Sequence, residues 1–252
     1  MIIFTSSKGQ DFSPATPPLP HTEPEFQHKA RELNAILNTL DLAGLQQLMG
    51  ISAPLAARTR EQILGFAAAE PKPALLTYSG EAFRSLNAAA FSIEDFRFAQ
   101  AHFRIFSGLY GPLRPLDLIA PHRLEMGYKL TNPAGESLYP FWSKDITAHL
   151  NAALKQESAP LLINLASMEY SKVVEKKKLC GPWIDIQFKE QAGDTLKSVA
   201  IYAKRARGMM ASYLIKNRIE TLNDVIPFSD GGYTYHPELS KERLLVFTRP
   251  QP

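Results

Sequence analysis

The chain has 252 residues, and its 28 lysines and arginines exceed its 25 aspartates and glutamates, which gives a formal net charge of +3. The hydrophobic fraction of 45% and the charged fraction of 21% are ordinary for a soluble globular protein. The single cysteine, Cys180, excludes an internal disulfide and fits a reducing compartment. No apolar run is long enough to span a membrane, so we expect a cytoplasmic protein. The mild positive charge permits a nucleic-acid partner but does not require one.

The first predicted element is a short buried strand formed by the apolar residues 2–4. A small polar loop follows at residues 5–9, and Lys8 within it could hold an anion. The loop is not a P-loop, because the spacing Gly-x-x-x-x-Gly-Lys-Ser/Thr is absent.

Helices separated by short turns are predicted for residues 22–66. A capping-box pattern at residues 22–25 opens the first helix, and a shorter helix begins at Asp41. The stretch around 41–66 resembles a helix-hairpin-helix element, with Gly50 and Ser52 in its hairpin. Free backbone N–H groups at the start of the following helix can face a phosphate in such an element. Purely structural helical hairpins share this pattern, so both interpretations stay open.

Residues 92–106 are predicted to form a helix, with Ser92 as its N-cap and an aromatic stripe that includes Phe96, Phe103 and Phe106. The glycines and prolines of residues 107–121 then prevent long regular elements.

Charged residues are interleaved with apolar ones along this helix and loop. They are Arg104, Arg114, Arg123, Asp117 and Glu125. One hypothesis is a rigid platform that presents the arginines to a ligand. The other is a buried crossover in which the arginines pair with the two carboxylates.

Apolar runs predict further strands at residues 74–78 and 161–165, the second covered on both faces. Glu169 comes shortly after the second run, where the carboxyl ends of strands present functional groups. Lys172 follows in the densest basic stretch of the chain.

Three cations crowd the first turns of a predicted helix that runs to Asn217. They are Lys204, Arg205 and Arg207. Cations oppose the helix dipole at this end, so phosphate is a natural ligand for them. The alternative is pairing with Asp117, Glu125 or Glu169.

Six histidines are scattered without His-Glu-x-x-His or Cys/His spacing. We therefore expect no metal site and no cofactor.

The segment at residues 107–127, Ser-Gly-Leu-Tyr-Gly-Pro-Leu-Arg-Pro-Leu-Asp-Leu-Ile-Ala-Pro-His-Arg-Leu-Glu-Met-Gly, resembles the signature of the YaaA family of bacterial peroxide-stress proteins. Three more blocks match in order, at residues 163–170, 202–208 and 245–247. The resemblance implies protection against hydrogen peroxide, lowered free intracellular iron, and DNA binding through a basic cleft and a helix-hairpin-helix. It also implies an unusual fold.

We therefore expect one α+β (mixed α/β) domain over residues 1–252, with a mixed sheet, surrounding helices and a basic cleft. The preferred function is that of a monomer binding duplex or branched DNA through backbone phosphates, with little sequence specificity. The residues expected at the phosphates are Lys8, Gly50, Ser52, Arg104, Arg114, Arg123, Lys172, Lys204, Arg205 and Arg207. The alternative is an enzyme acting on a nucleotide or damaged base, with Asp117, Glu125 or Glu169 as acid or base.

Overall fold

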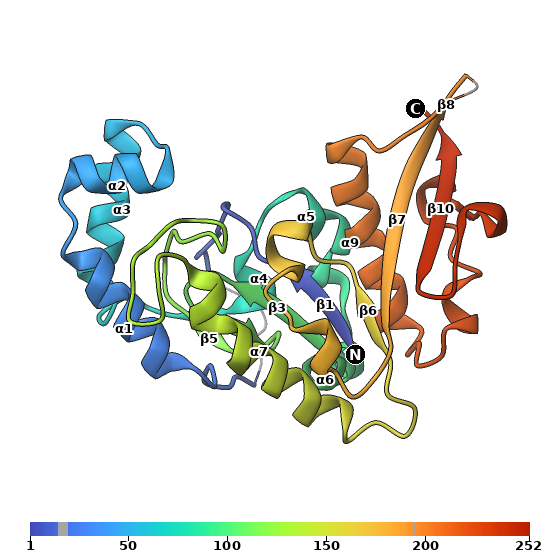
Figure 1. Ribbon diagram of the computed structural model, residues 1–252, viewed down its shortest axis with the longest axis horizontal. Coiled ribbons are helices and arrows are strands. Elements are labelled where there is room, and N and C mark those ends of the chain that lie inside the picture. The colour runs from blue at the N-terminus through green and yellow to red at the C-terminus, as the bar shows by residue number, and fades with distance from the viewer. Residues whose placement is uncertain (15–19, 194) are drawn as a thin grey trace.

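A mixed sheet runs through the middle of the molecule (Figure 1). The computed structural model describes residues 1–14, 20–193 and 195–252, so residues 15–19 of the predicted proline-rich segment lie outside it. The eight strands of this sheet have the order β4-β3-β1-β6-β7-β10-β9, and β8 pairs with β7. The predicted mixed α/β single-domain architecture is confirmed.

The strands of the sheet are β1 (Ile2–Thr5), β3 (Phe103–Ser107), β4 (Gly111–Leu113), β6 (Leu162–Asn164), β7 (Trp183–Ala192), β8 (Thr195–Lys197), β9 (Thr234–Tyr235) and β10 (Leu244–Pro250). A separate two-stranded pair is formed by β2 (Lys72–Pro73) and β5 (Leu118–Ile119). The central strands β3, β1, β6, β7 and β10 are mutually parallel, whereas β4, β8 and β9 pair antiparallel.

The α-helices are α1 (Gln27–Asn38), α2 (Leu42–Met49), α3 (Ala53–Gly65), α4 (Ala74–Thr77), α5 (Glu81–Leu86), α6 (Ile93–His102), α7 (Leu138–Leu154), α8 (Met168–Ser171) and α9 (Ala200–Lys216). Short 3-10 helices follow at Ala88–Ala90, Lys176–Lys178, Asn223–Val225, Asp230–Gly232 and Pro237–Leu239. Helices α1, α2 and α3 lie at the opposite end of the molecule from β7 and β10 (Figure 1).

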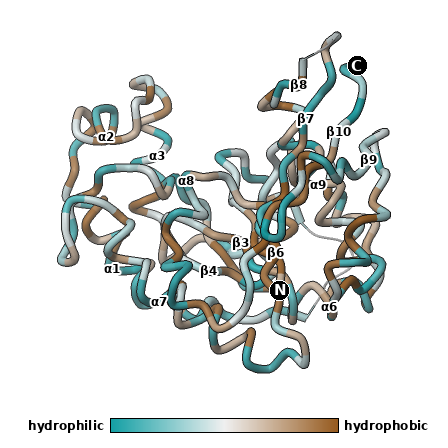
Figure 2. Tube along the Cα trace, turned by 45° about the vertical axis from the view of Figure 1, so that its right-hand side comes forward, coloured by the Kyte–Doolittle hydropathy of each residue, from teal (hydrophilic) through white to brown (hydrophobic). Residues whose placement is uncertain are grey.

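The core follows the central strands, along which hydrophobic residues concentrate (Figure 2). The predicted strands at residues 2–4 and 161–165 are confirmed as β1 and β6. Both are central parallel strands of the sheet, β1 between β3 and β6 and β6 between β1 and β7, and their residues are almost all buried. Trp142 is fully buried, and its indole Nε1 donates to the Gly108 carbonyl at 2.9 Å.

Three predicted elements differ in the structure. The helix predicted to reach Phe106 ends at His102, and Phe103–Ser107 forms β3 because these residues pair with β1. The strand predicted at residues 74–78 is the helix α4 (Ala74–Thr77), which follows Pro73 at its N-cap and has Tyr78 as its C-cap. The capping box predicted at residues 22–25 is absent, since the Thr22 hydroxyl donates to Asp117 and α1 begins at Gln27.

The N-cap of α6 is confirmed. The Ser92 hydroxyl accepts from the Asp95 N–H at 3.1 Å, and the Asp95 carboxylate accepts from the Ser92 N–H at 2.9 Å. This reciprocal pair satisfies two backbone donors at the start of the helix, which is the reason the sequence pattern was informative.

Candidate nucleic-acid interface

The site lies where the order of the parallel strands reverses. In chain order the five parallel strands occupy sheet positions 2-1-3-4-5, so the reversal falls between β1 and β6. Ligands of open α/β sheets bind outside the carboxyl ends of strands at this point. The loops after β1 and β6 meet here, because the Ser167 N–H donates to the Thr5 hydroxyl oxygen at 2.7 Å.

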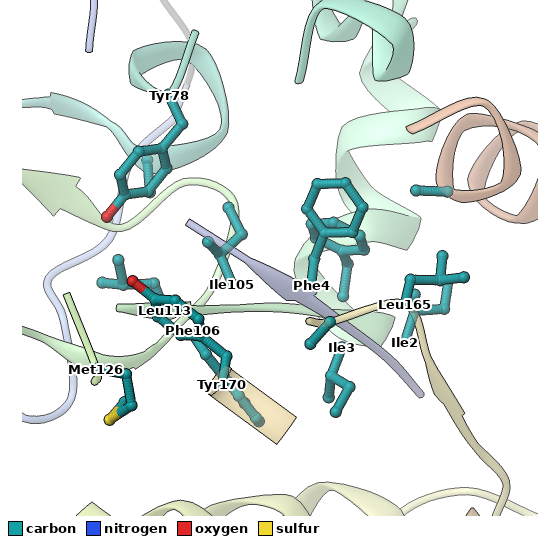
Figure 3. Packing of buried hydrophobic residues seen from close by; sticks show 14 of the residues in the cluster. Ile2, Ile3, Phe4, Tyr78, Ile105, Phe106, Leu113, Met126, Leu165 and Tyr170 are labelled. Atoms are coloured by element: carbon teal, nitrogen blue, oxygen red, sulfur yellow. The ribbon is translucent and has the colours of Figure 1, made fainter. Parts of the chain in front are cut away.

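A network of hydroxyl groups underlies these loops. Ser6 Oγ lies 3.2 Å from the Tyr170 hydroxyl. Tyr78, the C-cap residue of α4, extends into the same region. In Figure 3 the hydroxyl groups of Tyr78 and Tyr170 point into the same region at one side of the core cluster. Burial raises the pKa of both phenols, so each stays a neutral hydrogen-bond donor.

His122 forms the inner wall of the site and is buried. Its Nδ1 lies 2.8 Å from the Ala120 carbonyl oxygen, and its Nε2 lies 3.3 Å from the Tyr78 hydroxyl. The Gln10 side-chain oxygen accepts from the His122 backbone N–H at 3.2 Å. These contacts fasten the loop after β5 to the loop after β1.

Glu125 lies beside groups of this region, since Lys8, Arg123, Glu169 and the Tyr170 hydroxyl all act on its pKa. Burial raises its pKa, while the neighbouring Lys8 opposes that shift and the nearby Glu169 adds to it. Glu169 is exposed, and its Oε1 accepts from the Gly127 N–H at 2.8 Å. Two of the three predicted acid or base candidates, Glu125 and Glu169, therefore lie close together.

A basic pocket of about 200 Å³ opens beside this network. This basic pocket is lined by Lys8, Gly9, Gln10, Leu55, Arg58, Gln62, His122 and Arg123. Helix α3 forms one wall, and the loops after β1 and β5 form the other. Arg123 Nε is buried and has no hydrogen-bond partner among the described residues. Such a donor favours an acceptor supplied by a ligand.

Lys8 and Arg123, predicted as phosphate ligands, thus meet in one pocket, and Arg58 is a third cation that the sequence reasoning missed. The signal for Arg58 was present in the sequence. Leu55, Arg58 and Gln62 recur at three- and four-residue steps, which places them on one face of the second hairpin helix.

The helical hairpin borders the pocket. Helix α2 ends at Gly50, whose φ of 61° is the left-handed conformation that glycine adopts without strain. Helix α3 starts after Ser52, which is exposed and whose side chain does not cap the helix. Pro54 has no N–H, so the N–H donors that start α3 are those of Ala53 and Leu55, which the Ser52 side chain does not cap. Leu55 also lines the basic pocket.

The cations of α9 occupy its second turn rather than its first, since the helix begins at Ala200. Arg205 Nε donates to the Glu81 carboxylate at 2.7 Å, and Arg205 and Arg84 together lower the pKa of Glu81. The predicted alternative partners Asp117, Glu125 and Glu169 are therefore wrong for Arg205. The adjacent Gly80 N–H donates to Ser7 Oγ at 3.1 Å, so α5 connects Arg205 to the loop after β1.

Lys204 is exposed, and Arg207 is partly buried. Neither forms an ion pair within the part of the chain that the structure describes. Burial lowers the pKa of Arg207. Lys172 lies elsewhere at the same end of the sheet, with its Nζ 4.3 Å from the centre of the Tyr139 ring, and the Tyr139 hydroxyl donates to the Glu169 carbonyl.

Arg104, Arg114 and Asp117 do not join this site, so their predicted convergence with Lys8 is wrong. Arg104 lies near the amino end of β3, where its Nε donates to His149 at 2.8 Å and burial lowers its pKa to about 10. Arg114 follows β4, antiparallel to β3, and its Nε donates to Asp117 at 3.1 Å. Asp117 is 1% exposed and also accepts from Thr22, so it holds a turn and is not an acid or base of the site.

Among residues 1–14, 20–193 and 195–252, no group of three or more histidine, cysteine, aspartate or glutamate side chains is placed to hold a metal ion. No helix in these ranges is long and apolar enough to cross a membrane.

The fold and the site define an α/β protein that gathers cations and buried hydroxyl groups at the reversal point of a mixed sheet. The chain belongs to the peroxide stress protein YaaA family, whose model matches residues 1–239. It is 44% identical over 233 residues to a UPF0246 protein of Legionella pneumophila (strain Lens), covering 90% of this chain and 91% of the relative. A UPF0246 protein of Maricaulis maris is 41% identical over 254 residues, covering 100% of this chain and 97% of its own.

Proposed function

We propose that this protein binds DNA during peroxide stress, with the α2–α3 hairpin and the basic pocket as its contact surface. The observation that carries the proposal is the meeting of Lys8, Arg58 and Arg123 in one pocket beside the first turn of α3. Family membership supports the role in peroxide stress.

The chemistry of the surface favours backbone contacts. The three cations can neutralise phosphates, and the N–H groups at the start of α3 can donate to a phosphate oxygen. Contacts of this kind fix position without reading bases, so binding to duplex or branched DNA has little sequence preference. Lys172, Lys204 and Arg207 would extend the contact along the same end of the sheet.

The proposed benefit to the cell is protection of bound DNA from hydrogen peroxide. A link to lowered free intracellular iron would then be indirect.

Fluorescence anisotropy of a labelled duplex across salt tests the proposal. The logarithm of affinity should fall linearly with the logarithm of salt concentration, because phosphate contacts release counterions. In the triple variant Lys8→Ala/Arg58→Ala/Arg123→Ala the slope should decrease by about 2.7, at about 0.9 per lost phosphate contact. The matched control Lys155→Ala/Lys177→Ala/Lys197→Ala removes three exposed cations from other surfaces and should keep the slope. Equal slopes for the two triple variants would reject the pocket as the DNA contact.

Glu125 supports a second candidate function, an enzyme that acts on a nucleotide or damaged base. A carboxyl group with a raised pKa beside Lys8 and the Tyr170 hydroxyl suits acid or base chemistry near neutral pH. Wild type and Glu125→Gln would be incubated with free nucleotides and with oligonucleotides carrying oxidised bases, and the products separated by mass. Turnover by wild type that is lost in Glu125→Gln would establish the enzyme, and turnover unchanged in the variant would exclude Glu125 from the chemistry.

A further inference from the structure

The basic pocket has more positive charge than one backbone phosphate, with about one negative charge, would neutralise. Lys8, Arg58 and Arg123 line a space of about 200 Å³, and none of the three forms an ion pair within the described ranges. A neighbouring carboxylate, Glu125, is close enough for Lys8 and Arg123 to lower its pKa against the effect of burial. The residues that line the pocket include three cations and no carboxylate, so the lining has an excess of positive charge.

The size of the pocket limits what can enter it. A cavity of about 150 Å³ holds a benzene-sized molecule, so about 200 Å³ admits a phosphate with part of its sugar but not a duplex. The phosphates along an uninterrupted duplex would pass over the mouth of the pocket. A phosphate at the end of a strand, or on a free nucleotide, can enter it.

The donors of the pocket suit three terminal oxygens on one phosphorus atom. Arg123 contributes its buried Nε, which lacks a partner among the described residues, and Lys8 and Arg58 add ammonium and guanidinium groups from opposite walls. The Gln62 amide lies beside them, on the same face of α3 as Arg58. A phosphate monoester offers three acceptor oxygens and a charge between about −1.5 and −2, whereas a backbone phosphodiester carries about one negative charge.

We propose that the basic pocket binds a phosphate monoester, and that its source is the phosphorylated end of a DNA strand. The choice of this source rests on the DNA-binding function proposed above. The protein would then hold the end or break of a strand in the pocket while the hairpin contacts the adjoining backbone.

The position of the pocket fits a strand end bound in the pocket with the adjoining backbone on the hairpin. Leu55 in the first turn of α3 lines the pocket, so the start of the second hairpin helix and the three cations share one opening. The opposite wall is held in place by Gln10, which accepts from the His122 N–H, and by the His122 ring against Ala120 and Tyr78. A pocket with fixed walls loses little conformational freedom when it binds.

The test compares DNA molecules of one sequence that differ only at their ends. Anisotropy at fixed salt would measure affinities for a nicked duplex with a 5′-phosphate, with a 3′-phosphate and with hydroxyl groups at the nick, and for the intact duplex closed by hairpins. We expect one of the phosphorylated ends to bind about tenfold more tightly than the hydroxyl end, since two charges face the cations rather than none. Affinity for all DNA molecules that is independent of the terminal phosphate would overturn the inference and leave the DNA-binding proposal intact. Absence of binding to every DNA would reject the DNA-binding proposal itself.

Substitutions and a competing nucleotide test whether the preference for a phosphorylated end arises in the basic pocket. Lys8→Ala and Arg58→Ala change exposed side chains, so they should fold, and each should remove most of the tenfold preference. Lys177→Ala, an exposed lysine outside the pocket, should keep it. A nucleoside monophosphate should compete with the phosphorylated end, whereas the nucleoside should not. Competition by the monophosphate without a preference for phosphorylated ends would assign the pocket to free nucleotides and overturn the strand end as its source.

Discussion

The hydroxyl of Tyr78 lies 3.3 Å from Nε2 of His122, at the base of the candidate site. The other ring nitrogen, Nδ1, lies 2.8 Å from the Ala120 carbonyl, which can only accept a hydrogen bond, so Nδ1 carries the proton. Nε2 is then the acceptor and Tyr78 the donor. The arrangement needs a neutral imidazole, and burial agrees with this by lowering the pKa of His122 to about 4.

The buried neutral state of His122 predicts a loss of stability in acid. The unfolded chain takes up a proton on this residue near pH 6.5, whereas the folded chain does so only near pH 4. Between these values the unfolded state binds more protons, so the free energy of unfolding falls as pH falls. The total decrease is about 3 kcal/mol. Urea denaturation from pH 7.5 to 4 should show this loss in wild type and a smaller one in His122→Gln. His28→Gln, which changes an exposed histidine, should behave as wild type, and a parallel curve for His122→Gln would contradict the prediction.

Glu125 should have the opposite pH dependence. Because burial raises its pKa in the folded protein, the folded state binds more protons in the window that starts at the ordinary glutamate pKa and extends upward. Ionisation of Glu125 therefore reduces stability as pH rises through that window. The stability of Glu125→Gln relative to wild type should increase between pH 4 and 7, as measured by urea denaturation.

The control for this prediction is Glu70→Gln, which changes an exposed glutamate. Its difference from wild type should stay flat over the same range. A flat difference for Glu125→Gln would show that Lys8 and Arg123 compensate the burial of the carboxylate fully.

Local sequence patterns predicted the elements whose signals do not depend on distant partners. The apolar runs of β1 and β6 and the Ser92 capping box of α6 are of this kind. The spacing of Phe103 and Phe106 from Phe96 is typical of a helix, and it predicts one there. In the structure they lie in a strand buried on both faces, so no alternation of polar and apolar residues marks it.

The sequence predicted only part of the site, because the rest depends on strand pairing between distant segments. The charge and flanking residues of Lys8 and Arg123 predict phosphate ligands, and the two side chains meet in the basic pocket. Arg104 looked equivalent in the sequence, but the pairing of Ile3 with Arg104 puts it near the amino ends of the strands. Which end of a sheet a residue occupies depends on strand pairing between segments about 100 residues apart, and no local pattern encodes it.

The crossing of α5 and α9 predicts that Gly208 tolerates no side chain. A Cβ atom at this position would lie 2.0 Å from the Ala82 carbonyl oxygen and 2.9 Å from the Leu86 nitrogen, and both are backbone atoms. Gly208→Ala should therefore force the helices apart and cost about 1–3 kcal/mol of stability. Thermal unfolding should show a melting temperature lowered by about 2–4 °C for each kcal/mol.

Gly65→Ala is the matched control, because among the described residues no atom outside the local helix backbone and the two chain neighbours lies within 4 Å of its Cβ position at the end of α3. Alanine favours a helix over glycine by about 0.5–1 kcal/mol, so this variant should be as stable as wild type or more so. The same substitution thus has opposite expected signs at the two sites. A Gly208→Ala protein as stable as Gly65→Ala would mean that the two helices are not in close contact.

Tyr233 should stabilise a carboxylate that has no access to solvent. Glu190 on β7 is 0% exposed, and the Tyr233 hydroxyl donates to its Oε1 while the Val199 N–H donates to Oε2 at 3.2 Å. Burial and the adjacent carboxylate raise the pKa of Tyr233, so its proton stays available for this bond. Tyr233→Phe removes one donor and should lower the free energy of unfolding by about 1.5–3 kcal/mol, because a buried charge loses a partner.

Urea denaturation of Tyr233→Phe beside Tyr235→Phe checks this expectation, since the half-buried Tyr235 has no side-chain hydroxyl bond to a described residue. Tyr235→Phe should change stability by well under 1 kcal/mol. In a Glu190→Gln background the loss caused by Tyr233→Phe should shrink, because a neutral amide needs the donor less than a carboxylate does. An equal loss in both backgrounds would show that the Tyr233 hydroxyl does not stabilise the protein through the charge of the Glu190 carboxylate.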